Sequence, residues 1–205
     1  MKDFLRRDFP NAQTFVEALF EVMEFFGGTS YFDSGVTQLE HALQTASLAQ
    51  QGGAVDSLVV SALLHDIGHM MVDEHDANPD FLDSNMRHEA AGARLLDRYF
   101  GPDVVVPVAL HVRAKRYLVR VEPNYAAILS PASQRSLLVQ GGPLSPQDAE
   151  AFAAQPQAEA AIALRRWDDK AKVGGNAVPS LQGFVPLLLA EARSKRLLPR
   201  TSMTA

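Results

Sequence analysis

The segment from Ser61 to Met70, "SALLHDIGHM", ends an apolar run with a histidine joined directly to an aspartate, and a second histidine follows four residues after the first. A buried carboxylate is costly unless a partner compensates its charge. Imidazole and carboxylate groups together suit zinc, iron, manganese or nickel, and a carboxylate can bridge two ions. The segment therefore predicts either a solvated corner or a bound cation at Asp66. If the helix continues past Asp66, His65 and His69 share one face.

Other groups of the same chemistry are expected on separate helices. They are His41, His88, His111 and Asp168. A single histidine is more often a helix cap or a hydrogen-bonded core residue than a metal ligand, but Asp66 needs a partner. Helices that each direct one such group inward form the metal sites found in bundle cores. Glu40 or Gln38 would then hold the histidine tautomers through second-sphere hydrogen bonds.

Hydrophobic spacing and cap signals predict helices nearly throughout the chain. We expect them over residues 11–26, 37–51, 55–66, 81–100, 102–112, 130–140, from 145 onward, 156–173 and 179–197. The helix over 55–66 is apolar on nearly all sides, which places it at the centre of the fold. Alternating strand patterns are absent. The predicted fold is an all-α helical bundle with the metal site at its centre. We expect one domain spanning 1–205, in which residues of about 11–197 form the folded part and the ends at 1–9 and 198–205 are loosely held.

The composition limits the partners. The chain has 205 residues and a formal net charge of −5, so no general field attracts nucleic acid or an acidic membrane, and an anion site needs a local basic cluster. Such a cluster lies at Arg113, Lys115, Arg116 and Arg120. The absence of cysteine excludes thiolate metal sites and thiol nucleophiles and fits a reducing cytoplasm. No signal peptide and no apolar run of the roughly 18 residues of a membrane span is apparent, and the oligomeric state stays open.

The ordered set of histidines and aspartates resembles the H…HD…H…H…D pattern of the HD-domain superfamily, over roughly residues 25–173. Most members are metal-dependent phosphohydrolases, and a minority are mixed-valent di-iron oxygenases. The segments "VTQLEHALQTA", "HDIGHM", "HVRAKRYL", "LSPASQRSLLVQGG" and "RRWDDKAK" are similar to those of the 1-hydroxyphosphonate dioxygenases, which act on 2-amino-1-hydroxyethylphosphonate or its trimethylammonium analogue.

This resemblance implies an HD-domain fold, two iron ions, Fe(II) and Fe(III), and O2 as co-substrate. It implies that His41, His65 and Asp168 bind one iron, that His88 and His111 bind the other, and that Asp66 bridges them as a catalytic residue. Tyr31 matches a tyrosine that occupies an iron position until substrate arrives. The substrate-anion contacts correspond to His69, Lys115, Ser133 and Arg165.

One position departs from the family pattern. The family has a glutamate three residues after the tyrosine, where it takes part in gating and contacts the substrate amine, and this chain has Ser34. The gating and the preference for a primary amine on the second carbon are therefore not expected to carry over to this chain, and Ser34 becomes a candidate contact to the substrate.

The expected activity is O2-dependent cleavage of the C–P bond of a small 1-hydroxyalkylphosphonate to a carboxylic acid and phosphate. One alternative is an HD-type phosphohydrolase that uses the same ligands and a hydroxide nucleophile on a nucleotide or other phosphoester. Another is a metal-sensing or signalling HD module, which would be expected to have lost ligands. Without the resemblance, Ser133 is an ordinary helix residue, Tyr31 a core residue, and Arg113, Arg116 and Arg120 a solvated face.

Overall fold

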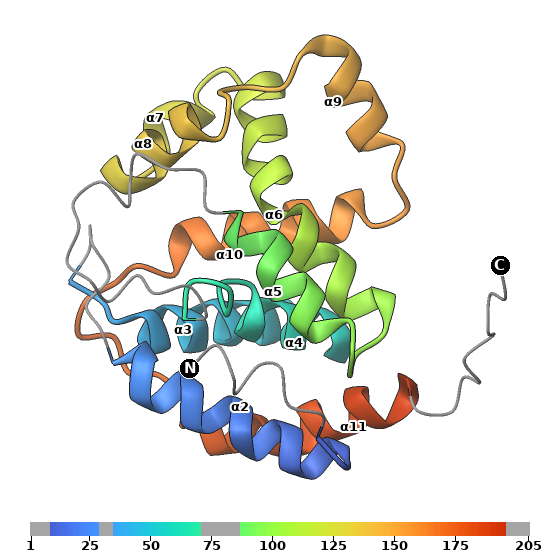
Figure 1. The fold of residues 1–205 in the computed structure, drawn as a ribbon. Coiled ribbons are helices and arrows are strands. Elements are labelled where there is room, and N and C mark those ends of the chain that lie inside the picture. Colours follow the sequence, from blue (N-terminus) through green and yellow to red (C-terminus); the bar gives the residue numbers. More distant parts are fainter. Residues whose placement is uncertain (1–8, 29–34, 71–86, 196–205) are drawn as a thin grey trace, which may run out of the picture.

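The computed structural model describes residues 9–28, 35–70 and 87–195, and every regular element in these ranges is a helix (Figure 1), which confirms the predicted all-α class. The elements are α2 (Ala12–Gly27), α3 (Gln38–Gln51), α4 (Asp56–Leu64), α5 (His88–Leu96), α6 (Pro102–Val121), α7 (Tyr125–Ile128), α8 (Pro131–Val139), α9 (Pro146–Ala153), α10 (Ala158–Lys170), the 3-10 helix η2 (Leu181–Phe184) and α11 (Val185–Lys195). None of the helices in these ranges is long and apolar enough to cross a membrane.

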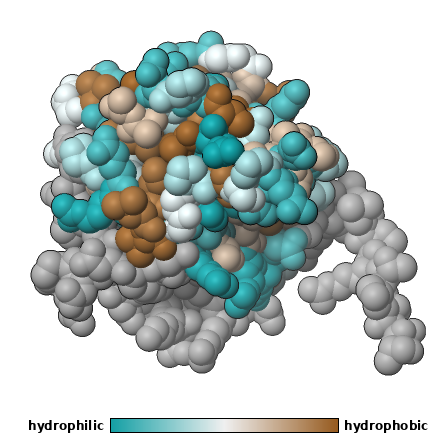
Figure 2. All heavy atoms as spheres, turned by 90° about the horizontal axis from the view of Figure 1, so that it is seen from above, coloured by the Kyte–Doolittle hydropathy of each residue, from teal (hydrophilic) through white to brown (hydrophobic). Residues whose placement is uncertain are grey.

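The helices form layers. Figure 1 shows α2 and α11 on one side, α3, α4, α5 and α10 in the middle, and α7, α8 and α9 beyond the far half of α6. The main hydrophobic core joins the layer of α2 and α11 to the middle layer through side chains such as Phe15, Leu63 and Phe100. Two smaller clusters, around Phe152 and around Leu118, pack against the second half of α6. The face seen from above mixes hydrophobic with hydrophilic residues (Figure 2).

Helix α4 lies at the centre, as its composition predicts. All its residues from Val59 to Leu64 are buried. The α-helix ends at Leu64, and the chain continues in tight turns in which the His69 N–H donates to the Asp66 carbonyl at 2.9 Å. His65 and His69 therefore do not share one α-helical face, and the tight turn sets the direction of Asp66 instead.

Gly68 allows this turn to lie directly against the start of α5. A Cβ at Gly68 would lie 2.0 Å from the His88 carbonyl oxygen, so only glycine permits this approach. The contact joins the segment carrying Asp66 to the helix carrying His88.

Side-chain caps fix several helix starts. Thr37 and Glu40 form a reciprocal capping box at α3, in which the Glu40 carboxylate accepts from the Thr37 N–H at 2.8 Å. Ser145 caps α9, where a helix is expected from residue 145 onward. Ser130 caps α8 by accepting from the Ser133 N–H, and this places Ser133 in the first turn of that helix.

Two predicted boundaries are wrong. Helix α6 continues to Val121 instead of ending at 112, because Ala114, Lys115 and Leu118 extend its buried face, and Pro107 lies inside it. The helix predicted over 81–100 is described only from residue 87 onward. There α5 spans His88–Leu96, so it ends before residue 100, and Arg87 adopts a left-handed conformation with φ 48° that an α-helix cannot include. The predicted part over 81–86 lies outside the described residues.

The predicted loose ends are only partly within the described ranges. Phe9 packs against the main core, and its N–H donates to the Tyr99 hydroxyl at 3.1 Å, so this residue is held. The other residues of the two predicted ends lie outside the described residues.

Candidate metal centre

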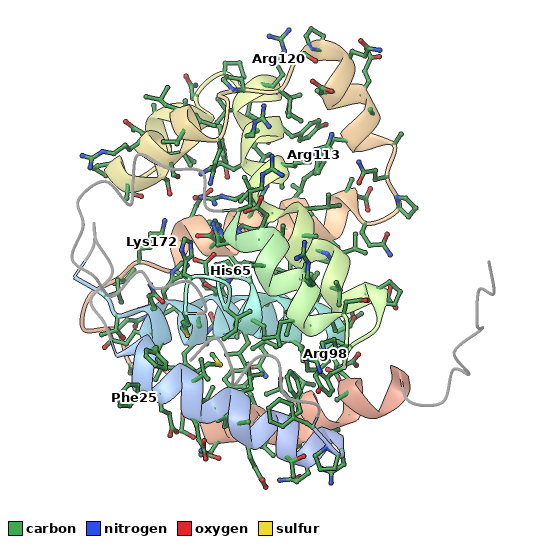
Figure 3. The ribbon with its side chains drawn as sticks, viewed as in Figure 1. Phe25, His65, Arg98, Arg113, Arg120 and Lys172 are labelled. Atoms are coloured by element: carbon green, nitrogen blue, oxygen red, sulfur yellow. The ribbon has the colours of Figure 1, made fainter. Side chains whose placement is uncertain are left out.

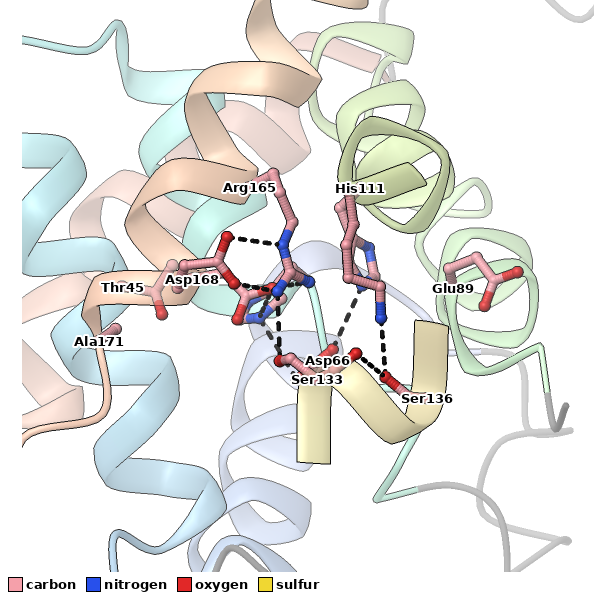
Figure 4. A network of polar contacts seen from close by, with 12 residues as sticks. Thr45, Asp66, Glu89, His111, Ser133, Ser136, Arg165, Asp168 and Ala171 are labelled. Carbon is pink, nitrogen blue, oxygen red and sulfur yellow. Dashed lines mark hydrogen bonds and ion pairs between the residues drawn. The ribbon is translucent and has the colours of Figure 1, made fainter. Parts of the chain in front are cut away.

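The structure brings all six predicted ligand side chains together in the middle layer. His41 comes from α3, His65 and Asp66 from the end of α4, His88 from α5, His111 from α6 and Asp168 from α10. All six are at least 92% buried. Figure 3 labels His65 at the centre of the molecule, and Figure 4 places Asp66 between the elements that carry His111 and Asp168.

The histidines form two pairs with Asp66 between them. The Nε2 atoms of His41 and His65 lie 3.2 Å apart, and those of His88 and His111 also lie 3.2 Å apart. The two oxygens of Asp66 face different pairs. Oδ2 is 3.4 Å from His65 Nε2, and Oδ1 is 3.5 Å from His111 Nε2.

The remaining distances follow the same division. Asp66 Oδ2 is 3.7 Å from His41 Nε2, and Oδ1 is 3.4 Å from His88 Nε2. Asp168 joins the first pair, with Oδ1 3.4 Å from His41 Nε2. One half of the cluster thus contains two histidines and Asp168, the other contains two histidines, and Asp66 contributes one oxygen to each half.

Backbone carbonyls determine which ring nitrogen faces inward. The Nδ1 atoms of His41, His65 and His111 lie 2.8, 2.9 and 2.7 Å from the carbonyl oxygens of Ala171, Ala62 and Val108. A carbonyl only accepts, so each Nδ1 carries a proton, and Nε2 faces the cluster, where it can present a lone pair to a metal ion. His88 differs, because its Nδ1 faces the Glu89 carboxylate at 3.7 Å.

Converging lone pairs need a cation. In the first half, two unprotonated Nε2 atoms would face each other at 3.2 Å beside two carboxylates. Two nitrogens bound to one ion at about 2.0–2.1 Å, with an angle near 90–110°, are separated by about 2.8–3.4 Å. The donor set and the spacing in both halves therefore fit a metal ion in each half.

The charges of the cluster favour the same arrangement. Burial lowers the pKa of His65, but the carboxylates of Asp66 and Asp168 outweigh it and raise this pKa to about 9. Burial and the neighbouring His69 lower the pKa of His88 to about 4. Burial also holds the pKa of His111 well below its usual range. The first half thus attracts positive charge at its nitrogens, and the second half keeps its imidazoles neutral, as metal ligands must be.

The predicted anion contacts adjoin the metal cluster. Lys115 is 2% exposed and its Nζ donates to Ser136 Oγ at 2.7 Å. Arg165 is buried, and its Nη2 donates to Ser133 Oγ at 3.4 Å. The Arg165 guanidinium also contacts Asp168 at 2.7 Å and the carboxylate of Asp169 (Figure 4).

His69 lies at the edge of the cluster. Its ring stacks on that of His88 with centroids 3.8 Å apart, its Nε2 is 3.9 Å from Asp66 Oδ1, and its side chain is 18% exposed. A triplet of Asp66, His69 and His88 has its donor atoms close enough for one ion. His111 lies closer to Asp66, at 3.5 Å from Oδ1, so His111 completes the second half of the cluster and His69 lies at its edge.

Some predicted roles are either outside the described residues or differ from the structure. Tyr31 and Ser34 lie outside the described residues. The suggestion that Glu40 orients a ligand histidine is wrong, because its carboxylate closes the capping box while His41 Nδ1 pairs with the Ala171 carbonyl. Arg116 donates to the Gly142 carbonyl at 2.7 Å, which is a structural role.

Sequence reasoning missed five polar residues beside the site. They are Glu89, Tyr125, Ser136, Asp169 and Lys172. Helical spacing offers a signal for two of them: Asp169 lies four residues after Arg165, and Ser136 lies three after Ser133.

The fold and the site define a class of helical proteins that direct histidines and aspartates into a central cluster able to hold metal ions. The HD-domain family model matches residues 39–168. The chain belongs to the HD-domain family, in the branch that includes phosphonate dioxygenases. It is 48% identical over 169 residues to the hydroxymethylphosphonate dioxygenase of Gimesia maris, covering 82% of this chain and 84% of that protein.

Two further relatives match over similar spans. The [1-hydroxy-2-(trimethylamino)ethyl]phosphonate dioxygenase (glycine-betaine-forming) of Leisingera caerulea is 36% identical, covering 82% of this chain and 88% of the relative. The uncharacterized protein L432 of Acanthamoeba polyphaga mimivirus is 33% identical, covering 85% of this chain and 80% of that protein.

Proposed function

We propose that this chain is an O2-dependent di-iron oxygenase that cleaves the C–P bond of a small 1-hydroxyalkylphosphonate. The observation that carries the proposal is the pair of histidine clusters on either side of Asp66, next to buried cations that can hold an anion. Two relatives named as phosphonate dioxygenases support the reaction class.

The metal-binding roles follow the division of the cluster. His41, His65 and Asp168 would hold one iron, His88 and His111 the other, and Asp66 would contribute one oxygen to each. When bound, the two irons supply the redox chemistry that activates O2. The protein fixes the positions of the ligands through the three backbone carbonyls that accept from Nδ1.

The substrate would be held through its phosphonate group. A 1-hydroxyphosphonate carries its hydroxyl and phosphonate oxygens on one carbon, so both can approach the same ion. Lys115, Ser133 and Arg165 would bind the remaining phosphonate oxygens, and His69 would contact the substrate from the edge. Charge-assisted hydrogen bonds from buried donors suit this task.

Hydroxymethylphosphonate is the first substrate to test. The 48% identical relative is named for it, and it has no second carbon, in keeping with Ser34 at the position of the amine-contacting glutamate. Its oxidation by one O2 gives formate, phosphate and one proton, which balances all atoms and charge. The C–P and O–O bonds are broken, and carbon is oxidised while O2 is reduced.

The direct test is phosphorus NMR of reactions with iron-loaded protein under air and under argon. The panel contains hydroxymethylphosphonate, 1-hydroxyethylphosphonate and the amino and trimethylammonium analogues, with a phosphomonoester as the comparison. We expect inorganic phosphate from a hydroxyphosphonate under air only. Phosphate release from the phosphomonoester under argon, with no turnover of any phosphonate, would replace the oxygenase with a phosphohydrolase.

A further inference from the structure

Lys172 is a buried cation beside the site that neither the sequence patterns nor the family resemblance singles out. It lies four residues after Asp168, just past the end of α10, and is labelled in Figure 3. Its Nζ donates to Ser133 Oγ at 3.1 Å and is 3.8 Å from Asp168 Oδ1, and its side chain is 9% exposed.

The hydroxyl of Ser133 is arranged to donate to a ligand. Its oxygen accepts from Lys172 Nζ at 3.1 Å and from Arg165 Nη2 at 3.4 Å. A hydroxyl oxygen has two lone pairs, so these two cationic donors fill them and the O–H points elsewhere. Among the described residues no acceptor for this O–H is found. A ligand oxygen at this position would accept it.

The charge of Arg165 is already matched within the protein. Its guanidinium contacts Asp168 at 2.7 Å and makes two further bonds to the Asp169 carboxylate. The Tyr125 hydroxyl donates to the same carboxylate and holds it in place. Arg165 therefore adds direction and hydrogen bonds more than net charge.

Two lysines bring basic groups to the serines of α8. Lys115 donates to Ser136, Lys172 donates to Ser133, and the two serines are one turn apart on α8. Lys172 Nζ is also 3.8 Å from Asp168 Oδ1. When Asp168 binds a metal ion, its charge is shared with that ion, so more of the positive charge of Lys172 is left for a bound anion.

We propose that Lys172 is a substrate-binding residue that, with Ser133, binds one oxygen of the phosphonate while Lys115 binds another, so that the site selects a doubly charged phosphonate over a singly charged group. This inference rests on the proposed function, because it assigns Lys172 to the phosphonate of that substrate. It predicts that removal of Lys172 weakens binding of dianions far more than binding of monoanions.

The test compares two small probes on iron-loaded protein by calorimetry. Above its second ionisation methylphosphonate carries two negative charges, and its monomethyl ester carries one on a nearly identical frame. The variants are Lys172→Met, Lys172→Arg and the matched control Lys170→Met, whose side chain is exposed at the end of the same helix. Iron content is measured in each variant.

In Lys172→Met we expect the Kd of methylphosphonate to rise about tenfold or more, because one charge-assisted hydrogen bond is lost. The Kd of the monomethyl ester should rise less than threefold, and the iron content should be unchanged. Lys172→Arg should keep most of the preference for the dianion, and Lys170→Met should bind both probes like the original protein.

Equal weakening of both probes, an unchanged Kd for methylphosphonate, or loss of iron in Lys172→Met would overturn the assignment. The binding measurement requires no turnover. The two proposals can therefore fail separately. If the protein releases no phosphate from hydroxyphosphonates but still prefers the dianion through Lys172, the oxygenase proposal is contradicted and the anion-binding role of Lys172 is supported.

Discussion

The contact between Gly68 and His88 gives the sharpest structural prediction. A Cβ at Gly68 would lie 2.0 Å from the His88 carbonyl oxygen, 2.7 Å from its carbonyl carbon and 3.0 Å from its Cα. All three are backbone atoms, so no side-chain rotation relieves the overlap. Ordinary contact begins at 3.4 Å, and Gly68→Ala must therefore separate the turn from the start of α5 by about 1.4 Å, an overpacking that typically costs about 1–3 kcal/mol.

A shift of that size acts directly on the metal centre. His88 Nε2 is 3.4 Å from Asp66 Oδ1 and 3.2 Å from His111 Nε2, so the half of the site containing His88 and His111 opens. We expect the free energy of unfolding to fall by about 1–3 kcal/mol, and the iron content after anaerobic loading to fall from two per chain towards one.

Urea denaturation and iron analysis measure the two effects. Gly183→Ala is the matched control, because the nearest atom to a Cβ at that position is Ser180 Oγ at 4.0 Å. Two irons per chain and unchanged stability in Gly68→Ala would refute the argument that this contact positions His88.

Perturbations at three other residues test the site. Asp66→Ala should lose both irons, because it removes the carboxylate that faces both halves; two irons retained by metal analysis would contradict its bridging role. Burial and the nearby Arg165 charge lower the pKa of Lys115 to about 7, so kcat/KM for hydroxymethylphosphonate should fall as the pH rises through about 7 and the ammonium loses its proton. Lys115→Arg should move that fall to higher pH, and an identical profile would show that another group titrates. Lys115→Ala should raise KM about tenfold or more with kcat less affected, and an unchanged KM would place its side chain away from the substrate. Tyr125→Phe removes the hydroxyl that holds Asp169 against Arg165 and should raise KM a few-fold at constant kcat and iron content; an equal loss of kcat would argue for a different role.

Much of this site is encoded locally in the sequence. Each ligand histidine or aspartate lies within or beside an apolar helical segment, and such segments must pack together, so the convergence of His41, His65 and His88 follows from helix patterning plus burial. The HD pair is informative because an acid at the end of a fully buried helix requires a compensating charge.

Other features depend on tertiary structure and could not be predicted. The residues after His111 resemble an exposed basic cluster, yet Lys115 is buried because α6 continues past His111, and the Lys115 Nζ donates to Ser136 of α8. The left-handed backbone of Arg87 has no signal in its side chain. The role of Lys172 depends on how the segment after α10 returns towards Ser133, 39 residues away in sequence.

The central claim is that Asp66 lies between two metal ions held in one cluster. Iron analysis with Mössbauer and electron paramagnetic resonance spectroscopy, after anaerobic loading with Fe(II) and partial oxidation, tests it most directly. The account predicts two irons per chain with the magnetic coupling of a carboxylate-bridged pair in the Fe(II)/Fe(III) state. One iron per chain, or two ions with no magnetic coupling, would contradict it.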